Sequence, residues 1–155
     1  MENNNIYSQN HFKFFDKIIT KKRFEIIDII NKQIFNNSII DVLDVGTTSD
    51  TENISSNLIV KGLKNVKEFH SISNQKIKSN FFKKILQKSI VENFSEDELE
   101  RFKSDMVISS ATIEHVGNYK NQKMMLRNMV KLCKKMIIIT TPNRYHPVDF
   151  HTKIP

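Results

Sequence analysis

Three short polar stretches hold the residue types that could bind a ligand and move a proton. Residues 44–50 read Asp-Val-Gly-Thr-Thr-Ser-Asp, residues 109–115 read Ser-Ser-Ala-Thr-Ile-Glu-His, and residues 140–147 read Thr-Thr-Pro-Asn-Arg-Tyr-His-Pro. Glycine lets a backbone approach a ligand closely, hydroxyl groups hydrogen-bond its polar atoms, and an imidazole titrates near neutral pH. These residue types therefore suit the binding of a polar small molecule beside a group that can accept a proton.

Each polar stretch directly follows a predicted buried strand, at residues 39–45, 105–110 and 136–141. In an open parallel sheet the carboxyl ends of the strands meet at one edge, where ligands bind. Taken singly, each stretch also has a purely structural explanation: Gly46 makes a turn, residues 114–115 begin a solvated helix, and Pro142 ends a strand. Their occurrence at the ends of successive strands favours one shared site.

The other elements follow from hydrophobic periodicity. We predict helices over residues 51–63, 76–87 and 122–135, a brief helix capped by Ser95, and strands over 65–72 and 90–91. One or two amphipathic helices are expected within residues 11–35. Alternating strands and helices imply right-handed crossovers, so the predicted fold class is α/β: a three-layer α/β/α sandwich with a mainly parallel, Rossmann-like sheet. Residues 1–38 are predicted to add a helical extension to an α/β domain at 39–155.

Composition narrows the class of protein. With 155 residues, 39% hydrophobic and 26% charged, the chain suits a soluble globular domain, and no apolar run approaches the ~20 residues that span a bilayer. The polar amino-terminus lacks a signal-peptide layout, so we expect a cytoplasmic location. The single cysteine, Cys133, makes no internal disulfide, which fits a reducing compartment.

The net charge of +7 raises nucleic acid as a partner. The cationic residues are 20 Lys and only 4 Arg, and they are scattered along the sequence. Arginine binds phosphates and base edges better than lysine, because its planar guanidinium group donates two parallel hydrogen bonds. We therefore expect no nucleic-acid binding. His146 and His151 have no compact Cys/His cluster around them, so no metal site is expected either.

Residues 41–46, Asp-Val-Leu-Asp-Val-Gly, and residues 104–116, Ser-Asp-Met-Val-Ile-Ser-Ser-Ala-Thr-Ile-Glu-His-Val, together resemble the Rossmann-like S-adenosylmethionine (SAM)-dependent methyltransferases. That family has an acid-x-Gly-x-Gly-x-Gly motif after its first strand and commonly an apolar-x-Glu-His-Val segment at the end of its fourth. Residues 138–147 look like the fifth strand and following loop of the methyltransferase type 11 and type 12 group. The resemblance covers residues 39–155.

The resemblance implies SAM as the cofactor and a set of contacts to it. By position in the motifs, the implied cofactor-binding residues are Asp44, Gly46, Thr47, Asp50, Ser71, Glu92, Ser110 and Ala111. Within this set, Ser71 would offer the ribose a neutral hydrogen bond, Glu92 would face the adenine amino group, and Ser110 and Ala111 would lie beside the adenosine.

The chain also departs from the family pattern. The second and third motif glycines fall on Thr48 and Asp50, and no carboxylate stands at the end of the second strand. The family fold continues into a sixth and a seventh strand, whereas this sequence stops at Pro155. We therefore expect a domain that is incomplete at its carboxyl end, with an exposed fifth-strand edge that favours pairing or association.

Three functions remain open. The first is a SAM-dependent methyltransferase acting on a small-molecule or glycan-type acceptor, with His115 and His146 as candidate bases, although lone histidines are more often structural. The second is a non-catalytic or truncated SAM-fold module that binds a nucleotide or a partner without turnover. The third, a nicotinamide-dependent Rossmann enzyme, ranks last because Gly-x-Gly-x-x-Gly is absent after the first strand.

Overall fold

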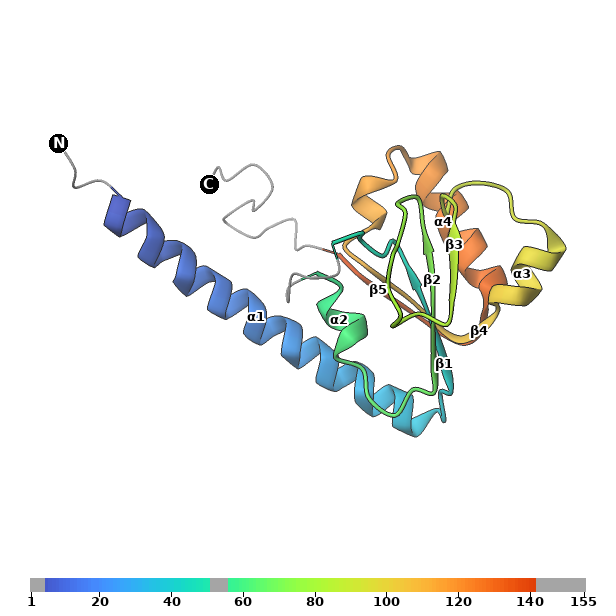
Figure 1. Ribbon diagram of the computed structural model, residues 1–155, viewed down its shortest axis with the longest axis horizontal. Coiled ribbons are helices and arrows are strands. Elements are labelled where there is room, and N and C mark those ends of the chain that lie inside the picture. Colours follow the sequence, from blue (N-terminus) through green and yellow to red (C-terminus); the bar gives the residue numbers. More distant parts are fainter. Residues whose placement is uncertain (1–4, 51–55, 142–155) are drawn as a thin grey trace.

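The chain folds into one parallel β-sheet with helices on both faces (Figure 1). The computed structural model describes residues 5–50 and 56–141, with side chains from residue 20 onward. The strands are β1 (Asp41–Val45), β2 (Glu68–Ser73), β3 (Lys84–Gln87), β4 (Ser104–Ser110) and β5 (Cys133–Thr140). They lie in the order β3-β2-β1-β4-β5, and all neighbouring pairs are parallel. From β1 the chain adds strands first on one side (β2, β3) and then on the other (β4, β5), so the strand order reverses between β1 and β4. This order is Rossmann-like and confirms the predicted fold class.

One face of the sheet is covered by α1 (Asn5–Asn36) together with the single turn of α2 (Leu58–Lys61). In α1, Ile27, Ile30 and Ile34 recur at helical spacing and pack in one cluster with sheet residues such as Val42. Gly62 permits this close packing, because a Cβ atom there would lie 2.7 Å from the Cδ1 atom of Ile27. The long helix thus supplies most of the layer on this face, and its amino-terminal part extends beyond the sheet (Figure 1).

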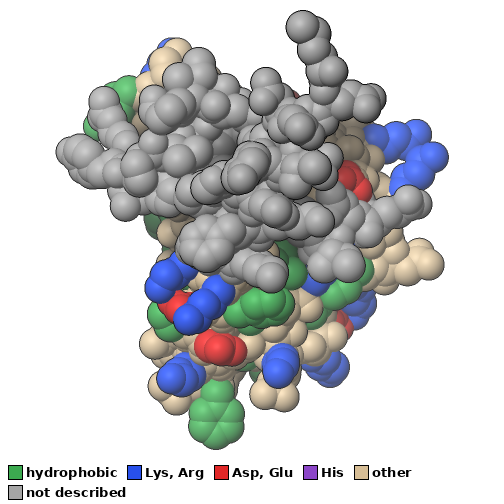
Figure 2. Space-filling view, turned by 90° about the vertical axis from the view of Figure 1, so that its left-hand side faces the viewer, with side chains coloured by type: hydrophobic (Ala, Val, Ile, Leu, Met, Phe, Trp, Pro, Cys, Tyr) green, Lys and Arg blue, Asp and Glu red, His purple; other side chains and the backbone are tan. Residues whose placement is uncertain are grey.

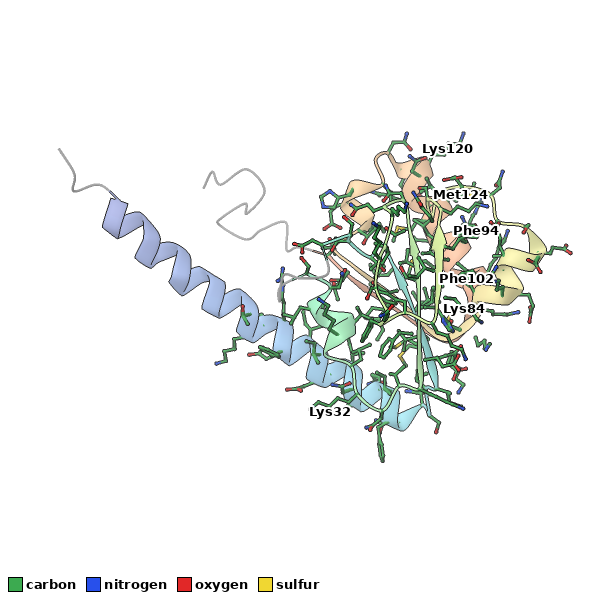
Figure 3. All side chains as sticks on the ribbon, in the orientation of Figure 1. Lys32, Lys84, Phe94, Phe102, Lys120 and Met124 are labelled. Atoms are coloured by element: carbon green, nitrogen blue, oxygen red, sulfur yellow. The ribbon has the colours of Figure 1, made fainter. Side chains whose placement is uncertain are left out.

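The opposite face is covered by α3 (Glu96–Phe102) and α4 (Tyr119–Leu132). Phe102, Met125 and Met129 are fully buried there. Figure 3 shows Phe94 and Phe102 beside α3 and α4, away from Lys32 on α1. The predicted start of α3 is confirmed: the Ser95 hydroxyl accepts from the Glu98 N–H, and the Glu98 carboxylate accepts from the Ser95 N–H.

The predictions for residues 76–91 were wrong. The expected helix over 76–87 is absent, and its last residues form β3, which pairs with β2 from His70↔Lys84 to Ser73↔Gln87. Ile85 packs toward the α1 side and Leu86 toward the α4 side, so the apolar side chains alternate as they do in a strand. Residues 90–91, predicted as a strand, belong to a turn in which the Glu92 N–H donates to the Ser89 carbonyl.

Several boundaries also moved. Within the described residues, the helix predicted over 51–63 is limited to α2, preceded by Asn57 in the left-handed conformation. The helix predicted over 122–135 begins at Tyr119, where the Asn118 side chain caps it, and it ends at Leu132. Cys133 therefore opens β5 instead of closing a helix. The predicted amino-terminal helices are one continuous helix.

Strand β5 lies at one edge of the sheet and pairs with β4, its one strand partner in the described part of the chain. None of the helices that the structure describes is long and apolar enough to cross a membrane. Figure 2 shows Lys and Arg side chains interspersed with acidic and hydrophobic ones on the described part of the face that it presents. The predicted association through β5 stays a prediction.

Candidate functional site

Gly46 marks the carboxyl end of β1 and shapes the loop that follows. It has a φ of +92°, which a residue with a side chain rarely adopts. A Cβ atom at this position would lie 2.2 Å from Thr112 Oγ1, so the fold needs a glycine there even without a ligand. The Gly46 N–H donates to the Ile72 carbonyl at 2.9 Å, and this bond ties the turn to the end of β2.

A chain of buried hydroxyl groups holds the loop after β1 against the end of β2. Thr47 Oγ1 donates to Asp44 Oδ2 at 2.6 Å, and Ser71 Oγ donates to Thr47 Oγ1 at 2.8 Å. Ser73 Oγ donates to the Thr47 carbonyl at 2.6 Å. Gln75 Oε1 accepts from the Ser49 N–H at 2.8 Å. The residues at the end of β2 therefore position the loop after β1.

Asp44 has an unusual electrostatic environment. Only 6% of the residue is exposed, and it has no ion-pair partner among the residues that the structure describes. Burial raises the pKa of Asp44 to about 6, and the hydrogen bond from Thr47 only partly opposes this effect. Because Asp44 and Val42 share one face of β1, the Asp44 side chain lies on the α1 side of the sheet.

The end of β4 supplies the third part of the site. Ser109 Oγ and Thr112 Oγ1 both donate to the Val45 carbonyl, at 3.0 and 3.3 Å. Ala111 has a φ of +50°, and its N–H donates to the Thr140 carbonyl. Left-handed backbone at a residue other than glycine is uncommon and clusters at functional sites. The ends of β1, β4 and β5 are thereby held together.

A cavity of about 400 Å³, which we call the loop cavity, opens between the loops that follow β1, β2, β3 and β4. Its walls combine apolar side chains with neutral polar ones, and none of the described residues lining it is acidic. The lining residues are Gly46, Thr47, Thr48, Ile72, Ser73, Asn74, Gln75, Ser89, Ile90, Val91, Ala111, Thr112, His115 and Val116.

A second cavity of about 310 Å³, the α1-side cavity, lies on the other side of Gly46. Gly46, Thr48 and Ala111 line both cavities, so the two spaces adjoin at the ends of β1 and β4. The α1-side cavity is lined by Arg23, Asp44, Gly46, Thr48, Ser56, Asn57, Leu58, Ile59, Val60, Ile108, Ser110 and Ala111.

The structure brings most of the predicted site residues to this edge of the sheet. Gly46, Thr47, Ala111 and His115 line the loop cavity, and Asp44 and Ser110 line the α1-side cavity with Gly46 and Ala111. His115 is exposed and lies in η1 (Ile113–His115), directly after β4.

The other predicted residues lie differently. Ser71 is fully buried with its hydroxyl directed to Thr47, and neither cavity is lined by it. Asp50 and Glu92 are exposed and also line neither cavity. His146 falls outside the described residues. A ligand role for any of these residues stays a prediction.

Glu114 is a further acidic residue near the end of β4. Both carboxylate oxygens of Glu114 are buried and have no hydrogen-bond partner in the part of the chain that the structure describes. Among those same residues, no group of three or more His, Cys, Asp or Glu side chains could hold a metal ion. Most polar groups that line the two cavities are hydroxyl, amide and backbone groups, and the ionisable side chains among the described lining residues are Arg23, Asp44 and His115.

Sequence reasoning missed several residues that build the site. Ser73 and Gln75 hold the loop after β1, Asn57 accepts from the Thr48 N–H, and Arg23 reaches the cavity from α1. Ser73 and Gln75 follow the second strand, so their position was a usable signal. No signal in the sequence could have identified Arg23, because its position beside the cavity depends on how α1 packs against the sheet.

The sequence matches no protein-family model and no curated protein. Among solved structures, the fold is similar to one described as a "putative caffeoyl-CoA O-methyltransferase from Staphylococcus aureus", with a TM-score of 0.43 and 16% sequence identity. The alignment covers 70% of this chain and 52% of that chain. The chain thus spans about half the length of that protein.

Proposed function

We propose that this chain is a SAM-dependent methyltransferase that acts on a small-molecule or glycan-type acceptor. The observation that carries the proposal is the loop cavity, which is built around Gly46 at the carboxyl ends of β1, β2 and β4. It lies beside the point where strand order reverses, where parallel α/β sheets bind their ligands. Residues 44–46 and 109–116, which resemble the family's motifs, stand at this edge.

The described residues fit the cofactor in size and in character. A volume of about 400 Å³ lies within the range of roughly 300–1,000 Å³ that small-molecule sites occupy. Ile72, Ile90 and Val91 offer apolar surface for a purine ring, while Asn74 and Ser89 offer neutral groups for ribose hydroxyls. The backbone at Gly46 and Thr47 would face the amino-acid end. In this assignment Asn74 takes the place of the usual carboxylate.

In methyl transfer the main task of the protein is to position the acceptor relative to the cofactor. The bound cofactor supplies a methyl group that is already activated by a sulfonium, so the acceptor must be held in line with it. An acceptor hydroxyl must also lose its proton, and His115, which lines the loop cavity, is the described residue best placed to take that proton at an imidazole nitrogen. The hydroxyl chain from Ser71 to Asp44 keeps the loop rigid during the step.

A second candidate function is a SAM-fold module that binds a nucleotide or a partner without turnover. The neutral lining of the loop cavity favours it, because no described residue there offers a carboxylate to the cationic groups of SAM. Thr48 also stands where the family has its second glycine, and it lines both cavities. Such a module would bind S-adenosylhomocysteine but would not convert SAM.

Calorimetric titration of the full chain with S-adenosylhomocysteine tests the proposal. We expect micromolar binding, equivalent to about 8 kcal/mol. Thr48→Phe should weaken it at least tenfold, because the side chain is exposed and adding bulk there fills the junction of the two cavities. Asn80→Phe adds the same exposed ring away from both cavities and should bind like the parent chain.

Each outcome has a definite meaning. Binding that Thr48→Phe removes and Asn80→Phe retains supports the cofactor site, and production of S-adenosylhomocysteine from SAM then separates the enzyme from the binding module. A chain that is folded by circular dichroism yet binds no S-adenosylhomocysteine contradicts the methyltransferase and leaves a module that binds a different nucleotide or a partner. Titration with a nicotinamide dinucleotide would in that case test the remaining Rossmann alternative.

A further inference from the structure

Arg23 is the one cationic side chain among the described residues that line the α1-side cavity. Arg23 lies on α1, is partly exposed, and has no hydrogen-bond or ion-pair partner among the residues that the structure describes. Its helix neighbour Lys22 is paired with Glu25 at 2.7 Å. An arginine presents a planar fork of donors that matches a carboxylate or a phosphate. Because no described residue accepts a hydrogen bond from these donors, an anion is the ligand that suits them.

The remaining lining shows what kind of molecule the anion would belong to. Leu58, Ile59 and Ile108 give the cavity an apolar wall, and Ser56 and Asn57 add neutral polar groups. Its volume of about 310 Å³ lies at the lower end of the range for small-molecule sites. A compact organic molecule with an apolar body and one anionic group matches this combination.

The two charged side chains among the described lining residues, Arg23 and Asp44, differ in exposure and would orient such a molecule. Arg23 is partly exposed, whereas Asp44 is only 6% exposed and lies deeper. Repulsion by the Asp44 carboxylate would keep the anionic group at the Arg23 end. The opposite end of the molecule would then lie near Gly46 and Ala111, where the α1-side cavity adjoins the loop cavity.

We propose that the α1-side cavity binds a small organic anion through Arg23 and that this anion is the methyl acceptor. The acceptor role rests on the proposed function, whereas anion binding does not. In the transfer, an oxygen or nitrogen of the acceptor forms a bond to the methyl carbon while the carbon–sulfur bond breaks. The sulfur keeps the electron pair of that bond, and the proton of the acceptor leaves to a nearby base or to water.

The test uses benzoate as the probe and benzamide as its neutral counterpart. Backbone amide NMR shifts of the full chain are followed with each probe, in the absence and presence of S-adenosylhomocysteine. We expect benzoate to shift the amides of Gly46, residues 57–60 and Ala111, and benzamide to bind at least tenfold more weakly. Arg23→Gln should weaken benzoate binding by roughly tenfold to a hundredfold, because a charge-assisted hydrogen bond is lost.

Lys22→Gln is the matched control, since it removes one cation from the adjacent position and keeps a good helix former there. Its ion pair with Glu25 is exposed, so its loss should change stability little. Benzoate shifts at the α1-side cavity that Arg23→Gln removes and Lys22→Gln retains would support the inference. Equal binding of benzoate and benzamide, shifts elsewhere, no shifts, or no effect of Arg23→Gln would overturn it.

The two proposals fail separately. If S-adenosylhomocysteine binds but benzoate does not, the anionic acceptor is wrong and the cofactor site stands. If benzoate binds at the α1-side cavity of a chain that does not bind S-adenosylhomocysteine, the anion site stands and the acceptor role falls. Thermal unfolding by circular dichroism, compared across all three proteins, shows whether a lost signal reflects lost folding.

Discussion

Acidic side chains have different surroundings at the two ends of the strands. Where β1, β4 and β5 begin, Asp105 Oδ2 accepts from the Ile40 N–H at 2.9 Å and from Lys135 Nζ at 3.2 Å. Asp41 Oδ1 accepts from the Asp105 N–H at 3.0 Å, and Lys134 lies 3.8 Å from Asp41 Oδ2. The acids at this end are therefore paired with bases and with backbone donors.

Where the same strands end, two acids have no ion-pair partner among the described residues. Asp44 is buried, and its side-chain partner within the described part of the chain is Thr47. Both carboxylate oxygens of Glu114 are buried, and no described residue donates a hydrogen bond to them. Positive φ values do not separate the two ends, because Gly46, Ala111 and Gly117 have them here and Ser38 and Asn65 have them before β1 and β2. The pairing of acidic groups therefore distinguishes the two ends, and buried acids without a cation beside them are more common where ligands bind.

The largest expected effect comes from Gly46→Ala, which tests whether the carboxyl end of β1 depends on the close packing of Gly46 against Thr112. Both the positive φ and the contact with Thr112 oppose a methyl group, so we expect a loss of about 4 kcal/mol of unfolding free energy in urea titrations. Gly117→Ala is the control, since its φ is +93° but its Cβ would lie 3.5 Å from the nearest atom. That variant should lose only about 1–2 kcal/mol. Equal losses of unfolding free energy in the two variants would show that the contact with Thr112 does not contribute to the cost of Gly46→Ala.

The second expected effect is a pH dependence caused by Asp44. The folded-state pKa of about 6 exceeds the ordinary value of 3.8, so the protonated carboxyl favours the folded state. Its contribution is full below about pH 4 and is lost as the pH rises through 6. Asp44→Asn should remove this dependence. At pH 7.5 its free energy of unfolding should exceed that of the parent chain by on the order of 3 kcal/mol.

Urea titrations of both proteins from pH 4 to 7.5 check this expectation. The difference between the two proteins isolates Asp44, because every other titrating group is common to both. A difference that does not change between pH 4 and 7.5 would mean that the carboxyl titrates normally in the folded chain. It would also weaken the contrast between the two ends of the strands.

The third expected effect concerns Asp105, at the end of the sheet where the strands begin and the acids are paired. Burial opposes ionisation of Asp105, but the hydrogen bonds from the Ile40 N–H and Lys135 outweigh it and lower the pKa of the carboxyl. The charged form therefore stabilises the fold above the ordinary pKa, and this stabilisation is lost as the pH falls through the folded-state pKa. Asp105→Ala leaves the Ile40 N–H without its acceptor and should cost about 2 kcal/mol at pH 7.

Asp28→Ala serves as the control for Asp105→Ala, because Asp28 is an exposed acid on α1. We expect it to change the unfolding free energy by less than about 0.5 kcal/mol. If the two variants unfold alike, the acids at the beginning of the strands are not held by the hydrogen bonds described above.

The smallest expected effect is on binding and leaves stability unchanged. Asn74→Ala removes an exposed amide that lines the loop cavity and should weaken S-adenosylhomocysteine binding about fivefold, the size of one neutral hydrogen bond. Asn80→Ala removes an exposed amide that lines neither cavity and should have no effect. Calorimetry that finds the two variants equal would remove Asn74 from the proposed ribose contacts.

Much of the fold could be predicted because it follows from local patterns. The buried β-branched runs at β1 and β4, the Ser95 cap of α3 and the turn at Gly46 are set by residues close together in sequence. The alternation of strands and helices then restricted the fold to a parallel sheet with right-handed crossovers. These features give the edge at which the candidate site lies.

Contacts between distant segments decided the rest. The run at residues 81–86 suits a helix by spacing, yet pairing with β2 makes its end a strand. Ser71 was predicted to contact the ribose, and this stays a prediction, whereas the pairing of β2 with β1 decides that its hydroxyl is buried and donates to Thr47. Arg23 reaches the α1-side cavity only because α1 packs closely on Gly62. Sequence by itself determined four of the five strands, the turn at Gly46 and the chemical groups beside them. Tertiary packing decided that β3 is a strand and which of those groups share a cavity, since both depend on residues far apart in the chain.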